Sequence, residues 1–238
     1  MDLNETQKNW DKLAKSDPLY AVLSDPAKRG KGWDEAEFFA TGQAEIEALC
    51  SEAVQRGLAF GNERALDFGC GVGRLSQALA AHFEAVVGID IAPSMLDLAR
   101  AYDRSQGRCR FVLNERPDLA LFPDAHFDLV YSNIVLQHMA PELALGYIPE
   151  FIRVLKPGGF VVFQLPSAAE RSWWRGALKA CLPKPVLESY RKFRYGKDFE
   201  AGVEIEMNGV SETEVLGSLR MAGARIVSHD NGWYWAQK

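Results

Sequence analysis

The chain has 238 residues, of which 47% are hydrophobic and 25% charged, and its formal net charge is −5. This length suits one domain with additions, and the composition is typical of a globular protein with a sizeable core. The acidic balance argues against a general binder of nucleic acid or membrane surfaces, and no apolar run approaches the roughly 20 residues that cross a bilayer.

The four cysteines are scattered along the chain and form no C-x-x-C pair. Neither a zinc site nor a disulfide framework is therefore predicted, and no metal is expected. Free thiols suit a reducing compartment, and the first residues, MDLNETQKNWDKLAK, lack the apolar core of a secretory signal. We therefore predict a cytoplasmic protein.

Residues 1–60 are predicted to form a helical N-terminal cap on a single domain that spans 1–238. Residues 1–40 carry aromatic and turn residues without a sustained period, which favours short helices and loops. Apolar residues recur at helical spacing in Thr41–Arg56, and Gly57 follows as a stop signal.

Strand and helix signals alternate between residues 61 and 166. This alternation is typical of βαβ units, so we expect an α/β fold with a parallel sheet, helices on both faces and right-handed connections. The predicted strands are Arg64–Phe68, Ala85–Ile89, Cys109–Leu113, Phe127–Ile134 and Gly159–Leu165. The predicted helices are Gly73–Ala81, Pro93–Arg100 and Pro141–Val154.

Residues 167–206 break this alternation and are predicted to be an insertion that caps the substrate. Between Ser167 and Lys197, eight Lys and Arg side chains stand against two acids, with aromatic residues interleaved. A self-contained helical cap, a pocket for a phosphate- or carboxylate-bearing small molecule, and an RNA surface are the alternatives. The acidity of the whole chain counts against RNA.

The last segment, residues 207–238, is predicted to add one helix and a hairpin. The helix is expected over Ser211–Ala222, and the strands over Ala224–Ser228 and Trp233–Gln237. The pair Asn231-Gly232 between the strands favours a tight hairpin turn. An antiparallel hairpin would therefore end an otherwise parallel sheet.

A glycine-rich turn links the first predicted strand to its helix in RALDFGCGVGRLSQAL. Gly69, Gly71 and Gly73 would let main-chain N–H groups approach a ligand closely. The dinucleotide fingerprint requires glycine where Arg74 stands, which disfavours a nicotinamide or flavin oxidoreductase. Asp90 ends the next strand about 20 residues later, where a carboxylate can accept both ribose hydroxyls. The structural alternative for Asp90 is a helix cap.

The segments LDFGCGVGRLS, VVGIDIAPSMLDLAR, FDLVYSNIVLQHM and LKPGGFVVFQLP resemble the successive motifs of class I S-adenosylmethionine-dependent methyltransferases. The likeness covers residues 64–166, and MNGVSETEVLGSLRMAGARIV is similar to the late helix and sixth strand of that family. The resemblance implies a Rossmann-like doubly wound sheet that is mostly parallel, with an antiparallel C-terminal strand. It also implies S-adenosyl-L-methionine as cofactor and S-adenosyl-L-homocysteine as product.

The resemblance assigns roles around the glycine turn. Asp67 would meet the ammonium group of the cofactor, directly or through water. Gly69 and Gly71 would let the backbone pass close to the ligand, Gly73 would begin the helix, and Asp90 would hold the ribose.

The resemblance assigns fewer roles at the adenine end of the cofactor site. Ile91 and Met95 would flank the adenine face, although core residues would give the same pattern. Family members often carry a small residue followed by Asp after the third strand, where this chain has Asn114 and Glu115. The N–H of Arg116 would face a ring nitrogen. Which side chain reads the adenine amino group stays open.

The fourth strand would end over the sulfonium. The remaining cofactor contacts implied by the resemblance are Cys70 and Arg74 in the glycine turn, Ser132 and Asn133 beside the methionine part, and Gln137 and His138 at the mouth of the site. Helix capping or core packing is the alternative for His138.

The predicted reaction is methyl transfer to an oxygen, nitrogen or carbon of a small-molecule acceptor by in-line displacement. The sulfonium already activates the methyl group, so the protein has to hold the nucleophile about 3 Å from it. A base is needed only where the acceptor must lose a proton. His138 and His229 are the candidate bases, and Tyr20, Trp173 and Trp174 are the candidate substrate contacts.

Two further functions stay open from the sequence. One is an RNA or protein methyltransferase with the same core, and the other is a module that binds S-adenosylmethionine without turnover. The expected partner is a small-molecule acceptor, and the cationic side chains of the insertion would allow that acceptor to be anionic. Neither a membrane nor a nucleic acid is expected as a partner.

Overall fold

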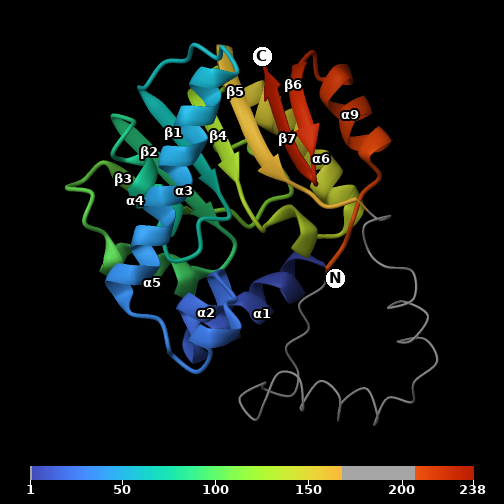
Figure 1. Cartoon of the computed structure of the whole chain (residues 1–238). Helices are drawn as coiled ribbons and strands as arrows, with labels where there is room; N and C mark the ends of the chain where they lie inside the picture. The colour runs from blue at the N-terminus through green and yellow to red at the C-terminus, as the bar shows by residue number, and fades with distance from the viewer. Residues whose placement is uncertain (1, 168–206) are drawn as a thin grey trace, which may run out of the picture.

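The computed structural model describes residues 2–167 and 207–238, which build one seven-stranded sheet (Figure 1). The strand order is β3-β2-β1-β4-β5-β7-β6; β1 to β5 run parallel, and β7 is antiparallel to both β5 and β6. This confirms the predicted fold. The strands are β1 (Arg64–Phe68), β2 (Ala85–Asp90), β3 (Cys109–Leu113), β4 (Phe127–Ser132), β5 (Leu155–Gln164), β6 (Arg225–Asp230) and β7 (Trp233–Gln237).

Helices cover both faces of the sheet, because side chains alternate along each strand and both sets are apolar. Leu66 and Phe68 of β1 face the core under α6 and α9, while Ala65 faces the core under α3 and α4. Figure 1 shows α3 crossing one face of the sheet and α6 on the other. The helices are α1 (Leu3–Ser16), α2 (Pro18–Val22), η1 (Pro26–Lys28), α3 (Glu35–Gln55), α4 (Arg74–Leu79), α5 (Pro93–Tyr102), η2 (Leu136–His138), α6 (Pro141–Val154) and α9 (Glu212–Met221).

The N-terminal cap is more regular than predicted. α1 is a 14-residue helix, and Asp2 and Glu5 form a capping box at its start. α3 begins at Glu35, six residues before the predicted start, because the Asp34 side chain accepts a hydrogen bond from the N–H of Glu37 at 3.0 Å. Figure 1 places α1 and α2 beside the edge where the parallel strands end.

Several strand limits also differ from the prediction, by up to four residues. β4 ends at Ser132 instead of Ile134, because Ile134 has a φ of 59°, a conformation that cannot continue a strand. β5 begins at Leu155, earlier than predicted, where that residue pairs with Phe127. The hairpin turn agrees with its prediction, since Asn231 (φ 49°) and Gly232 (φ 75°) both adopt the left-handed conformation of a two-residue turn. Its first strand, β6, runs over Arg225–Asp230 instead of Ala224–Ser228.

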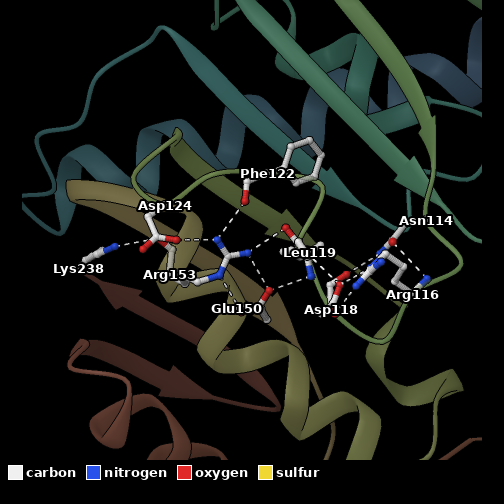
Figure 2. A network of polar contacts seen from close by, with 10 residues as sticks. Asn114, Arg116, Asp118, Leu119, Phe122, Asp124, Glu150, Arg153 and Lys238 are labelled. Carbon is white, nitrogen blue, oxygen red and sulfur yellow. Dashed lines mark hydrogen bonds and ion pairs between the residues drawn. The ribbon is translucent and has the colours of Figure 1, made fainter.

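The connection between β3 and β4 is held by a polar network around Arg153 (Figure 2). The Arg153 guanidinium donates to both carboxylate oxygens of Glu150 at 2.8 Å, to the Leu119 and Phe122 carbonyls, and to Asp124. A planar group with five donors can satisfy such a set at once. The network fixes the loop that follows Asn114, the residue directly after β3.

We expect Arg153→Lys to lower the free energy of unfolding by about 1–3 kcal/mol, because an ammonium cannot reach both backbone carbonyls and both carboxylates. Urea unfolding would measure this. Arg104→Lys is the matched control, since the Arg104 side chain is 69% exposed and its replacement should stay within about 0.5 kcal/mol. Equal effects of the two variants would contradict this role of Arg153.

Within the described residues, none of the helices combines the length and hydrophobicity needed to traverse a lipid bilayer. No cluster of three or more His, Cys, Asp or Glu side chains in the same parts of the chain could hold a metal ion.

Candidate functional site

The glycine turn lies between β1 and α4, at the carboxyl end of the sheet. Gly69, Gly71 and Gly73 have φ values of 77°, 53° and 82°, which disfavour any residue with a Cβ atom. The N–H groups of Gly69 and Cys70 both donate to the Ile89 carbonyl of β2, at 2.8 and 2.9 Å. The turn is therefore pinned to the neighbouring strand and crosses the end of the sheet.

Side chains of this same chain pack tightly against the three glycines. A Cβ on Gly69 would lie 2.3 Å from Val135, and one on Gly71 would lie 2.8 Å from Val22. A Cβ on Gly73 would lie 2.9 Å from the Phe111 ring. Glycine at these positions thus allows α2, β3 and the loop after β4 to pack closely against the turn, in addition to any ligand.

Asp90 ends β2 and braces the turn. One carboxylate oxygen accepts the N–H of Gly71 at 2.9 Å, and the other accepts the N–H of Ala92, also at 2.9 Å. Burial raises the pKa of Asp90, and these backbone hydrogen bonds oppose that rise. Each carboxylate oxygen can accept a second hydrogen bond, so the brace leaves capacity for a ligand hydroxyl.

Asp67 lies on β1 and is 1% exposed. Its Oδ2 accepts the hydroxyl of Ser76 at 2.6 Å, whereas its Oδ1 has no hydrogen-bond partner among the described residues. Burial raises its pKa to about 7, against the opposing effects of the Ser76 hydrogen bond and the Arg74 charge. A buried acceptor without a donor is costly, which points to a donor supplied by a ligand or by water.

The raised pKa of Asp67 predicts a pH dependence of stability. Between the ordinary pKa of 3.8 and about 7 the folded chain holds a proton on Asp67 that the unfolded chain has lost. The contribution of Asp67 to the free energy of unfolding is therefore largest below the lower value and falls as pH rises through the higher one. In Asp67→Asn this contribution is absent, so urea titrations should show the variant gaining on the parent from pH 5 to pH 8. A stability difference that is constant with pH would contradict the assignment.

A cavity opens beside the turn where the strand order reverses between β1 and β4, the place where open α/β sheets bind ligands. Asp90, on β2, is at its wall. Eight of the predicted site residues line it: Gly69, Gly71, Asp90, Ile91, Met95, Asn114, Asn133 and His138. The ring of His138 meets the edge of the Trp10 ring, with centroids 5.5 Å apart.

The other predicted site residues within the described chain lie off this cavity; they are Tyr20, Asp67, Cys70, Gly73, Arg74, Glu115, Arg116, Ser132, Gln137 and His229. Arg74 is buried and its guanidinium donates to Glu45 and Thr41. His229, on the outermost strand β6, faces Glu212 of α9 at 3.1 Å. Trp173 and Trp174 are outside the described residues.

α1 forms one wall of this cavity, where the sequence indicated only that aromatic residues of the N-terminal cap, Trp10 among them, could close over the cofactor. Leu3, Thr6 and Trp10 line it at helical spacing. The amide of Gln7 donates to the Ile91 carbonyl at 2.9 Å and to Glu115 at 2.8 Å. The i, i+3, i+7 placement of Leu3, Thr6 and Trp10 is too short a pattern to predict this wall as a whole.

A doubly wound α/β sheet with a cavity at its switch point is the architecture in which nucleotide-binding α/β folds hold their ligands. A family profile described as "Methyltransferase domain" matches residues 66–163. The chain is 33% identical over 125 residues to a malonyl-[acyl-carrier protein] O-methyltransferase of Serratia marcescens, covering 51% of this chain and 47% of that protein. It is 36% identical over 104 residues to a trans-aconitate 2-methyltransferase of Methylobacterium radiotolerans, covering 43% and 37%.

Solved structures show the same fold. A methyltransferase from Clostridium acetobutylicum, described as S-adenosylmethionine-dependent, superposes with a TM-score of 0.58 at 17% identity, over 89% of this chain and 95% of that one. A Leishmania major protein superposes with a TM-score of 0.64 at 14% identity, over 99% and 82%. Residues 66–163 thus match a methyltransferase domain, and the comparisons together support a class I S-adenosylmethionine-dependent methyltransferase. It spans about half the length, or less, of the curated relatives it matches.

The residues of the cavity fit S-adenosylmethionine, the cofactor of this class. Asp90 offers two oxygens for the ribose, Ile91 and Met95 offer apolar surface for the adenine, and the side-chain oxygen of Asn133 has no hydrogen-bond partner among the described residues. These are the residues that would hold the group.

Proposed function

We propose that this protein transfers the methyl group of S-adenosylmethionine to a small-molecule acceptor at the cavity between β1 and β4. The observation that carries the proposal is the hydrogen bond from the N–H of Gly71 to Asp90 on one cavity wall, which supports a role for Asp90 as the ribose acceptor beside a main chain without side chains. The relatives that act on trans-aconitate and in ubiquinone biosynthesis support a small acceptor.

The cofactor supplies the reactive methyl group, whose sulfonium leaving group is neutral after transfer. The protein has to bind, orient and exclude water, because in-line attack depends on the position of the nucleophile. α1 contributes to binding and to the exclusion of water by placing Trp10 at the cavity. Where the acceptor must lose a proton, we propose His138 as the base that accepts it. The position of His138 in the cavity lining supports this role.

The experiment that tests the proposal has two stages. First, calorimetry should detect binding of S-adenosylhomocysteine and none of NADH. Second, purified protein should be incubated with methyl-labelled S-adenosylmethionine and, separately, with the small-molecule, RNA and protein fractions of a cell extract, followed by mass spectrometry of labelled products. A labelled small molecule supports the proposal. Binding of S-adenosylhomocysteine with label found only in RNA or protein would contradict the small-molecule acceptor, and binding without any label would favour a module without turnover.

A further inference from the structure

Glu45, in the middle of α3, joins three elements through one carboxylate. Its Oε1 accepts the Tyr131 hydroxyl of β4 and the side-chain amide of Asn133, both at 2.7 Å. Its Oε2 accepts the guanidinium of Arg74 at 2.8 Å, and Arg74 is only 4% exposed. Hydrogen bonds to charged groups in such surroundings are stronger than neutral ones, so this network holds its members in place.

The carboxylate also decides which way the Asn133 amide points. A carboxylate can only accept hydrogen bonds, so the NH₂ group of Asn133 has to face Glu45 and the oxygen has to face away. That oxygen, Oδ1, is buried and has no hydrogen-bond partner among the described residues. Asn133 also lines the cavity beside the glycine turn, together with Gly69 and His138.

We infer that Glu45 is a positioning residue for the methionine end of the cofactor. It holds Asn133 with Oδ1 available to accept a hydrogen bond from the cofactor's ammonium group, and it does so without touching the cofactor. The inference rests on the proposed function, because it requires S-adenosylmethionine in this cavity. It explains why a buried acceptor is left without a donor next to a ligand cavity, which would otherwise cost stability for no gain.

The test compares the binding of S-adenosylhomocysteine to the parent and to three variants by calorimetry. Glu45→Gln removes the charge that orients the amide and should weaken binding about tenfold, the loss expected for one hydrogen bond to a charged group. Asn133→Ala should weaken it by a similar factor. The double variant should bind no more weakly than Asn133→Ala alone, because Glu45 acts only through Asn133.

Two controls separate positioning from mere stabilisation. Tyr131→Phe removes a different donor from the same carboxylate oxygen, so it should lower the melting temperature while leaving the affinity within twofold. 5′-Methylthioadenosine lacks the amino-acid part of the cofactor, so its affinity should be the same in the parent and in Glu45→Gln. If Glu45→Gln does not fold, Glu45→Asp keeps a negative charge at this position of α3 but shortens its reach by one methylene, and it should weaken the binding of S-adenosylhomocysteine in the same way.

Several outcomes would overturn the inference. One is a Glu45→Gln protein that is less stable but binds S-adenosylhomocysteine like the parent. Another is a double variant whose loss is the product of the two single losses, or a Tyr131→Phe protein that loses as much affinity as Glu45→Gln. Equal weakening of 5′-methylthioadenosine would also overturn it. A parent protein that binds no S-adenosylhomocysteine would instead refute the proposed function.

Discussion

Replacing Gly71 by valine is expected to abolish binding of S-adenosylhomocysteine, with an affinity loss of at least 100-fold. Gly71 has a φ of 53°, and any Cβ there would lie 2.8 Å from Val22. A β-branched residue would both strain the turn and push its methyl groups into the cavity that Gly71 lines. Calorimetry on the folded variant measures the effect.

Gly107→Val is the matched control for this substitution. Gly107 has a φ of 84°, and a Cβ there would meet nothing within 4 Å. It lies just before the amino end of β3, away from the cavity, so the variant should carry a similar backbone penalty of about 1–2 kcal/mol and bind normally. If Gly71→Val binds as tightly as Gly107→Val, the glycine turn is not part of the cofactor site.

Asp90→Ala should weaken the binding of S-adenosylhomocysteine by a free energy of about 1–3 kcal/mol, because charge-assisted hydrogen bonds to the ribose are lost. That range corresponds to about five- to 150-fold in Kd. The variant also leaves the N–H groups of Gly71 and Ala92 without their carboxylate, so a fall in melting temperature should accompany the loss. Asp97→Ala on α5 is the control, since that side chain is 77% exposed.

A ligand lacking one ribose hydroxyl separates the two roles of Asp90. The parent should bind the 2′-deoxy analogue of S-adenosylhomocysteine more weakly than the natural ligand, because one acceptor bond is lost. Asp90→Ala should bind both ligands equally. If the variant still discriminates between them as the parent does, Asp90 braces the turn and does not read the ribose.

The succession of strands and helices along the chain could be predicted from the sequence, because each element follows a local signal. Apolar runs alternate with helical patterns from Arg64 onward, and Asn231-Gly232 requires a turn that few other pairs allow. The limits of β4 could not be predicted, because the left-handed backbone of Ile134 arises from the packing of the loop that follows it. β-branched residues adopt that conformation only when tertiary structure imposes it.

The cavity was predictable where its residues follow directly on strands, as Gly69 and Asp90 do. The wall formed by α1 was not, because its contacts with Ile91 and Glu115 join parts of the chain more than 80 residues apart. The same holds for Glu45. A single glutamate within a helix gives no local signal that its carboxylate reaches a residue 88 positions away.

A crystal structure of the protein with S-adenosylhomocysteine tests the central claim most directly. The account predicts ligand density between β1 and β4, with the ribose hydroxyls within hydrogen-bonding distance of the Asp90 carboxylate and the adenine against Ile91 and Met95. Density elsewhere on the protein, or a ligand whose ribose points away from Asp90, would contradict it.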